Sequence, residues 1–214
     1  MRRLAAHAWD STDASLMEAV AVLSAGGVVA YPTETFYGLA VDPRDPIAID
    51  GLFAAKGREK SRAIPLIAAS LDQLLEVAGD VGGRVRAVAG RFWPGPLTVV
   101  IPAWPGLALA IHGSSGTVAV RVSSHPIASG LARAFGHPIT STSANPSGAP
   151  PIAEADGVEA ALGAAVTLLI DGGRTPGGEP STIVDLTAAE PRLIRAGAIA
   201  WDAVVASLRA GPSS

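Results

Sequence analysis

The stretch "ITSTSANPSGAPP", Ile139 to Pro151, begins as a β-strand would and then changes character. Small side chains with hydroxyl or amide groups follow its first residue: Thr140, Ser141, Thr142, Ser143 and Asn145. The prolines and the glycine after them favour a turn over regular structure. The stretch therefore predicts a strand that ends in an uncharged loop rich in hydrogen-bonding groups. It raises the question of what these groups bind.

Composition narrows the class of protein. The chain has 214 residues, of which 49 % are hydrophobic and 16 % are charged, so we expect a large packed core rather than disorder. The formal net charge of -3 argues against a protein that depends mainly on the phosphate backbone of nucleic acids. The absence of cysteine excludes disulfides and thiolate metal sites. The N-terminal segment lacks the apolar run of a signal peptide, and we expect a cytoplasmic protein without a membrane span.

The rest of the sequence indicates the fold class. Short apolar runs rich in β-branched residues alternate with Ala- and Leu-rich stretches of helical period. Strands outnumber the helices between them, and several strands follow one another directly, which favours a mixed sheet. We therefore predict an α/β protein with a single domain, residues 11–209, in which a mixed β-sheet is flanked by helices. Residues 210–214 are expected to form a flexible tail.

Lysine is rare in this chain, because only Lys56 and Lys60 are lysines among the 16 basic residues. Both lie in "AAKGREKSRAIP", at the predicted end of a helix, together with Arg58 and Arg62. Basic side chains suit a helix C-terminus, so a solvated cap is one interpretation. The other is a receiver for a polyphosphate, since a Lys point charge beside an Arg fork suits phosphate oxygens.

Two further segments place polar groups near strand ends. In "YPTETFYGLAVDP", Thr33, Glu34 and Thr35 follow a buried strand, where ligands of open α/β sheets usually bind. A turn capped by hydroxyls is the alternative. Arg121, near the end of the strand in "VAVRVSSHP", needs an anion, which is either a ligand or a structural salt-bridge partner.

The remaining segments with polar or ionisable residues offer no evident nucleophile. The Gly-rich "DGGRTPGGEPSTIVDL" lacks the order of a P-loop and precedes a strand, so it predicts a flexible loop that could act as a lid. The 4 histidines and the carboxylates show no metal-ligand spacing. A site of cations, hydroxyls and backbone amides suits a reaction whose nucleophile belongs to the substrate, such as phosphoryl or nucleotidyl transfer.

Several motifs together carry a resemblance to a known family. The segments "PTETFYGLA", "KGR", "FWPGPLTVV", "VAVRV", "TSANPSG", "STIVDL" and "IRAG" follow the order and spacing of the YrdC-like L-threonylcarbamoyladenylate synthases. The resemblance runs from about Ser15 to Trp201. It implies the reaction of L-threonine, bicarbonate and ATP to L-threonylcarbamoyl-AMP, pyrophosphate and water, for N6-threonylcarbamoyladenosine modification of tRNA. It also implies a twisted mixed sheet with a basic concave face.

The resemblance implies the role of each matching residue. L-Threonine would be bound by Thr35, Arg121 and Ser181. ATP would be bound by Lys56, Arg58, Arg62, Thr117, Ser141, Ser143, Asn145 and Arg195. Lys56 and Arg58 would be the catalytic residues. The polar groups of the opening stretch would then form a nucleotide cradle, with Lys56, Arg58 and Arg195 supplying its positive charge.

Cofactors and partners follow from the same resemblance. Mg²⁺ is expected to arrive with ATP, without a protein-bound metal cage. The substrates would be ATP, L-threonine and bicarbonate, and tRNA-threonylcarbamoyl transferase proteins would act downstream, with room for weak tRNA binding. Two alternatives remain open: a carbamoyltransferase domain that forms a carbamoyl-adenylate, and a non-catalytic module that binds double-stranded RNA.

Overall fold

The computed structural model describes residues 1–6, 14–57 and 63–210. Arg58 and Arg62, both predicted to bind ATP, lie outside these ranges. The predicted tail also lies outside them except for its first residue, which belongs to the last helix.

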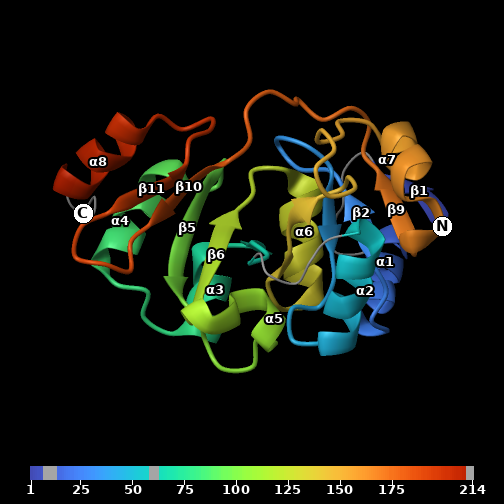
Figure 1. Cartoon of the computed structure of the whole chain (residues 1–214), viewed down its shortest axis with the longest axis horizontal. Helices are drawn as coiled ribbons and strands as arrows, with labels where there is room; N and C mark the ends of the chain where they lie inside the picture. The colour runs from blue at the N-terminus through green and yellow to red at the C-terminus, as the bar shows by residue number, and fades with distance from the viewer. Residues whose placement is uncertain (7–13, 58–62, 211–214) are drawn as a thin grey trace.

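The strands form two mixed sheets that lie side by side (Figure 1). The first sheet comprises, in spatial order, β1 (Arg2–Ala5), β9 (Leu168–Asp171), β2 (Val29–Tyr31), β3 (Gly38–Ala40) and β8 (Thr142–Ser143). The second comprises β11 (Arg192–Arg195), β10 (Thr182–Asp185), β5 (Leu97–Pro102), β6 (Thr117–Val122), β4 (Leu66–Ala68) and β7 (Ile139–Thr140). The predicted α/β class with mixed pairing is confirmed, but the strands divide between two sheets. β1 precedes the predicted domain start at residue 11 and pairs in parallel with β9.

The helices cover the outer faces of the two sheets. In the described ranges they are α1 (Ala14–Ser24), α2 (Pro46–Lys56), α3 (Leu71–Ala78), α4 (Gly83–Phe92), α5 (Leu109–His112), α6 (Pro126–Phe135), α7 (Ala155–Leu162) and α8 (Trp201–Ala210). Two short 3₁₀ helices follow α5 and α7, at Gly113–Ser115 and Gly163–Ala165. Helix α1 packs on α6, and α4 packs on α8. The central strands of both sheets are buried, whereas the edge strands β1 and β11 are largely exposed.

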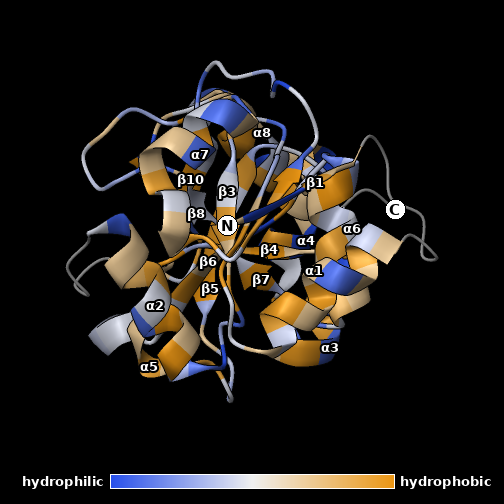
Figure 2. Ribbon diagram, turned by 90° about the vertical axis from the view of Figure 1, so that its right-hand side faces the viewer, coloured by the Kyte–Doolittle hydropathy of each residue, from blue (hydrophilic) through white to orange (hydrophobic). Residues whose placement is uncertain are grey.

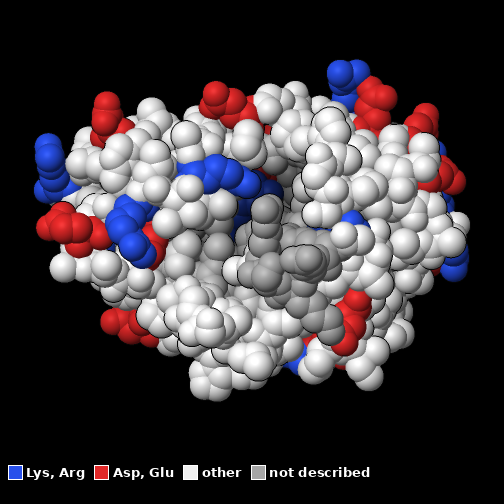
Figure 3. All heavy atoms as spheres, in the orientation of Figure 1, with Lys and Arg blue, Asp and Glu red and all other residues white. Residues whose placement is uncertain are grey.

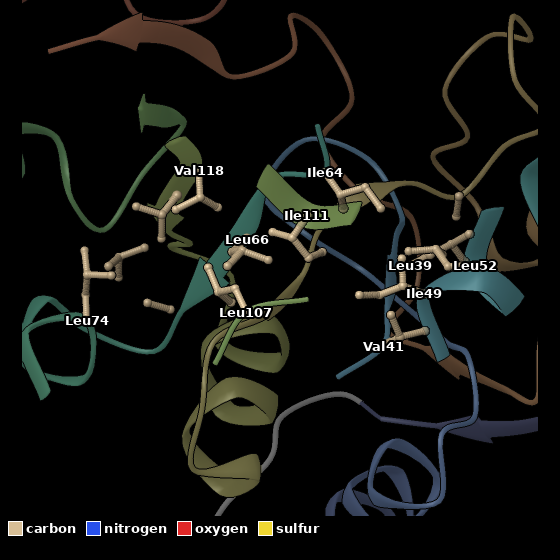
Figure 4. Packing of buried hydrophobic residues seen from close by; sticks show 14 of the residues in the cluster. Leu39, Val41, Ile49, Leu52, Ile64, Leu66, Leu74, Leu107, Ile111 and Val118 are labelled. Atoms are coloured by element: carbon tan, nitrogen blue, oxygen red, sulfur yellow. The ribbon is translucent and has the colours of Figure 1, made fainter. Parts of the chain in front are cut away.

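The core consists of two clusters of buried hydrophobic residues, one on each side of the strands. Neighbouring residues of a strand point to opposite faces, and Ala30 of β2 belongs to one cluster while Val29 and Tyr31 belong to the other. Figure 2 shows the hydrophobic strands enclosed by the helices. Figure 4 shows part of the larger cluster, where Leu39 of β3 and Leu52 of α2 lie together. Burial on both faces explains why these strands read as continuous apolar runs.

The opening stretch of the sequence joins the two sheets. β7 pairs antiparallel with β4 of the second sheet, and β8 pairs antiparallel with β3 of the first. The chain passes from one sheet to the other at Ser141, whose backbone N–H donates to Pro65 O at 2.7 Å. The Thr140 hydroxyl accepts from Val41 N at 2.9 Å and donates to Leu39 O at 3.1 Å. Thr140 therefore stabilises the crossing between the two sheets.

Candidate functional site

A cavity of about 370 Å³ opens where the two sheets meet. Its wall includes eight of the residues predicted from sequence: Thr35, Lys56, Arg121, Ser141, Ser143, Asn145, Ser181 and Arg195. Figure 3 shows Lys and Arg side chains gathered around a hollow near the middle of this face. The predicted basic concave face and the predicted binding residues therefore coincide.

Lys56 lies at the end of α2, and its side chain points toward the loop that contains Ser143 and Asn145. The helix begins at the N-cap Asp45, whose carboxylate accepts from Ile47 N at 2.8 Å, and it ends at Gly57, which adopts the left-handed conformation with φ 57°. The Lys56 side chain is buried, and its ammonium donates to Ser143 O and, at 2.7 Å, to Asn145 O. The sequence predicted only a cation that faces phosphates. The structure adds that this cation holds the backbone of the loop.

Asn145 fixes the shape of the same loop. Its Nδ2 donates to Pro146 O at 2.9 Å and to Ala149 O at 2.7 Å, which closes the turn. The Ser147 backbone N–H donates to Lys56 O at 2.8 Å. The side chains of Ser141 and Ser143 line the cavity on the other side of this turn. The loop therefore presents hydroxyls and backbone groups from a scaffold that its own amide and Lys56 hold in place.

The segment after β2 forms a second wall of the cavity. The Thr33 hydroxyl donates to Phe36 O at 2.7 Å, and its oxygen lies 3.2 Å from the Thr35 hydroxyl oxygen. Both threonines are buried. Arg121, from β6, forms an ion pair with Glu34 of the same segment. The anion that Arg121 was predicted to need is thus supplied in part by the protein.

Arg195 ends β11, and Ser181 immediately precedes β10, the neighbouring strand of the second sheet. Arg195 donates through Nη2 to Ser181 O at 2.7 Å and to Ser181 Oγ at 3.0 Å. The Ser181 hydroxyl oxygen lies 2.9 Å from that of Thr98 on β5. Burial lowers the pKa of Arg195 from its ordinary value, and the nearby charge of Arg121 lowers it further. These contacts place a guanidinium and a hydroxyl side by side in the wall.

The Gly-rich loop predicted from sequence connects β9 of the first sheet to β10 of the second, and Figure 1 shows it crossing the top of the molecule. Hydrogen bonds attach it to Thr35 and Tyr37 of the cavity wall and to Ala153. Gly177 N donates to Thr35 O at 2.8 Å, and Tyr37 donates its hydroxyl to Gly173 O at 2.7 Å. Thr175 N donates to Ala153 O at 2.9 Å. Burial raises the pKa of Tyr37 to about 12, so its hydroxyl stays protonated as a donor.

Of the predicted ATP residues that the structure describes, one is not brought to the cavity. Thr117 begins β6, and its hydroxyl contacts Ser115 at 3.1 Å. Because a strand rises about 3.3 Å per residue, Thr117 lies roughly 13 Å along the strand from Arg121. Its role in ATP binding is not supported by this position.

Three residues of the site were missed or only partly recognised from sequence: Thr33, Glu34 and Thr98. Thr33 and Thr98 line the cavity, and Glu34 pairs with Arg121 from outside the lining. The available signal for Thr98 was one hydroxyl within the apolar run "PLTVVI". The sequence indicated Glu34 as a polar residue near a strand end, but it did not indicate that Arg121, 87 residues away, is its partner.

Two negative findings apply to the described residues. They contain no group of three or more His, Cys, Asp or Glu side chains that could hold a metal ion. In the same ranges, no helix is both long enough and apolar enough to span a membrane.

Comparisons with known proteins identify the family of this chain. The Sua5/YciO/YrdC family model, described as telomere recombination, matches residues 21–197. The threonylcarbamoyl-AMP synthase of Chromohalobacter salexigens is 42 % identical over 175 residues, which cover 82 % of this chain and 94 % of that protein.

Solved structures give the same result for the fold. The Pyrococcus abyssi Sua5 structure complexed with L-threonine superposes with a TM-score of 0.88 at 34 % identity, covering 96 % of this chain and 60 % of that chain. Escherichia coli YciO superposes with a TM-score of 0.82 at 26 % identity, covering 92 % and 96 %. The match of the family model over most of the sequence, with these relatives, shows that the chain belongs to the Sua5/YciO/YrdC family.

Proposed function

We propose that this chain is a threonylcarbamoyl-AMP synthase, which converts L-threonine, bicarbonate and ATP to L-threonylcarbamoyl-AMP, pyrophosphate and water. The observation that carries the proposal is the cavity between the sheets, where Lys56, Arg121 and Arg195 meet a loop of hydroxyls and amides. Relatives that align over nearly their whole length bear the name of this enzyme. The Sua5 structure that holds L-threonine shares the fold.

The reaction needs two anions to approach each other. The threonine amine combines with bicarbonate to give a carbamate and water, and a carbamate oxygen then attacks the α-phosphorus of ATP. The bond from this phosphorus to the bridging oxygen breaks, and pyrophosphate leaves. Two unit charges 4 Å apart repel by about 4 kcal/mol at an effective dielectric of 20. The cations of the cavity offset this repulsion, so positioning and charge provide most of the catalysis.

The two substrates would occupy adjoining parts of the cavity, since Arg195 and Ser181 are in contact. The loop of Ser141, Ser143 and Asn145, with Arg195 across from it, would hold the nucleotide. Thr35, Arg121 and Ser181 would hold L-threonine, with Arg121 facing the carboxylate. This arrangement brings the amine of one substrate toward the phosphates of the other.

Mg²⁺ would enter with the triphosphate. The described part of the wall offers cations and hydroxyls, and the nearby carboxylate of Glu34 is engaged by Arg121 and Ser123. The phosphate oxygens themselves would hold the ion, which would neutralise charge on the departing pyrophosphate.

The product is a reactive mixed anhydride, and we propose that cytoplasmic tRNA-threonylcarbamoyl transferase proteins consume it, with weak tRNA binding by this chain itself.

Pyrophosphate release tests the proposed function. We expect release from ATP to require both L-threonine and bicarbonate and to fall when serine or alanine replaces threonine. The measurement is an assay in which each substrate is omitted in turn. Release that depends on carbamoyl phosphate would contradict the proposal and favour a carbamoyltransferase. RNA binding that is salt-dependent, with no release under any condition, would favour the non-catalytic module.

The contact between Thr98 and Ser181 leads to a second prediction. Thr98→Val removes a hydroxyl but keeps the shape of the side chain, so Ser181 loses one of its two hydroxyl contacts. A neutral hydrogen bond contributes about 0.5–1.5 kcal/mol, which corresponds to a rise of roughly two- to tenfold in the KM for L-threonine. Thr187→Val is the matched control, because it removes the hydroxyl bond to Asp185 outside the cavity. Equal KM values in both variants would exclude Ser181 as a threonine contact.

A further inference from the structure

The surroundings of Arg121 contain a carboxylate that the proposed mechanism does not use. Glu34 accepts from Arg121 Nη1 through Oε1 and from the Ser123 hydroxyl through Oε2. Only 8 % of the Arg121 side chain and 12 % of the Glu34 side chain are exposed. Arg121 is among the residues that line the cavity, whereas Glu34 is not. The pair therefore has one member facing the substrate space and the other behind the wall.

The guanidinium of Arg121 has room for a second carboxylate. Within the described ranges, the side-chain hydrogen bond of Arg121 is made to Glu34 through Nη1. A guanidinium carries five N–H donors in a planar fork and binds a carboxylate through two of them. Among the described residues, the edge formed by Nε and Nη2 has no hydrogen-bond partner, and Arg121 lines the cavity, so this edge can receive a ligand. Glu34 and a substrate carboxylate can occupy the same guanidinium at once.

The charge balance of the cavity also depends on Glu34. Arg121 and Arg195 both line the cavity, and the charge of Arg121 contributes to the lowered pKa of Arg195. Without Glu34, Arg121 would be a buried cation that faces another cation. Removing one partner of a buried pair is strongly unfavourable and favours a turn of the remaining side chain toward solvent. The Glu34 carboxylate offsets the charge of Arg121 within this buried pair.

We propose that Glu34 is a positioning residue for the amino-acid substrate: it fixes the Arg121 guanidinium so that the open edge of the fork receives the substrate carboxylate. Ser123 in turn holds the second oxygen of Glu34. This inference rests on the proposed function and adds a residue that acts through Arg121.

Glu34→Gln tests the proposal, because it removes the charge and nearly keeps the shape. We expect the KM for L-threonine to rise at least tenfold while the KM for ATP stays within twofold. Calorimetric titration with L-threonine should show the same weakening. Glu18→Gln is the matched control. It breaks the ion pair between Glu18 on α1 and Arg2 on β1, and neither residue lines the cavity. It should change neither KM by more than twofold.

A double variant separates positioning from a general loss of structure. If Glu34 acts through Arg121, Glu34→Gln combined with Arg121→Lys should weaken threonine binding by less than the product of the two single effects. An unchanged or lower KM for L-threonine in Glu34→Gln, or effects that multiply, would overturn the proposal.

Folding and the identity of the reaction are controlled separately. If Glu34→Gln does not fold, Ser123→Ala provides the same test, because it keeps the ion pair and releases one carboxylate oxygen, with an expected rise of threefold or more. Failure of the wild-type chain to release pyrophosphate with L-threonine would reject the proposed function itself. An active wild type beside an unaffected Glu34→Gln would reject only this inference.

Discussion

Lys56→Ala is expected to reduce threonine-dependent pyrophosphate release about a hundredfold or more. The ammonium of Lys56 donates to two carbonyls, at Ser143 and Asn145, of the loop that we propose binds the nucleotide. Hydrogen bonds from a charged donor contribute about 1.5–3 kcal/mol each, and about 1.4 kcal/mol is a factor of ten in rate. Loss of both bonds therefore loosens the cradle and removes a cation from the path of the phosphates.

The same substitution should leave the protein folded. A buried carbonyl without a partner costs about 1–3 kcal/mol, and each kcal/mol lowers the Tm by roughly 2–4 °C in a domain of this size. Arg84→Ala is the matched control, because Arg84 also donates to backbone carbonyls, at Leu186, Ala188 and Ala189, but lies outside the cavity. It should lower the Tm to a similar extent while kcat/KM is unchanged.

Binding of AMP shows how Lys56 acts. If the ammonium holds the loop, Lys56→Ala loses affinity for AMP as well as for ATP, because the cradle itself has changed. If the ammonium meets only the outer phosphates, AMP binds the variant as it binds the wild type. Turnover of Lys56→Ala within about threefold of the wild type, a difference of less than 1 kcal/mol, would refute both roles.

The sequence predicts the elements of this fold better than their arrangement. Helix α2 and strand β6 appear at the predicted places because capping residues, apolar period and turn signals are local. The division into two sheets depends on pairings between distant segments, such as β1 with β9, and no local pattern encodes those. Strands β1, β3 and β8 have only two to four residues, which is too short for a periodic signal in the sequence.

The site follows the same division between local and distant information. The loop at Ser141–Asn145 could be recognised because its polar groups are adjacent in sequence. The ion pair of Arg121 with Glu34 could not, because it joins residues 87 positions apart. Thr117 begins β6 and lies outside the cavity lining, so its predicted contact with ATP stays a prediction. A position in a motif does not say which end of a strand reaches the cavity.

Gly197→Ala is expected to have the other large effect, on stability and on the site together. Gly197 follows β11, and a Cβ at this position would lie 2.8 Å from Ser181 C and from Thr182 N, and closer still to Pro180 O. These are backbone atoms, so no flexible side chain can move aside. The backbone at Gly197 and the backbone at Pro180 to Thr182 would have to move apart, next to Ser181, whose carbonyl accepts from Arg195.

The expected result is a fall in stability of about 1–3 kcal/mol or more, as for other overpacked sites, with loss of most turnover. The measurements are thermal unfolding and pyrophosphate release on the same preparation. Gly90→Ala is the matched control, because its Cβ would meet nothing within 4 Å on helix α4. Alanine in a helix is favoured over glycine by about 0.5–1 kcal/mol, so this variant should be as active as the wild type and slightly more stable. Wild-type behaviour of Gly197→Ala would mean that the strand ends at Ser181 and Arg195 can separate without cost, and that their contact does not shape the site.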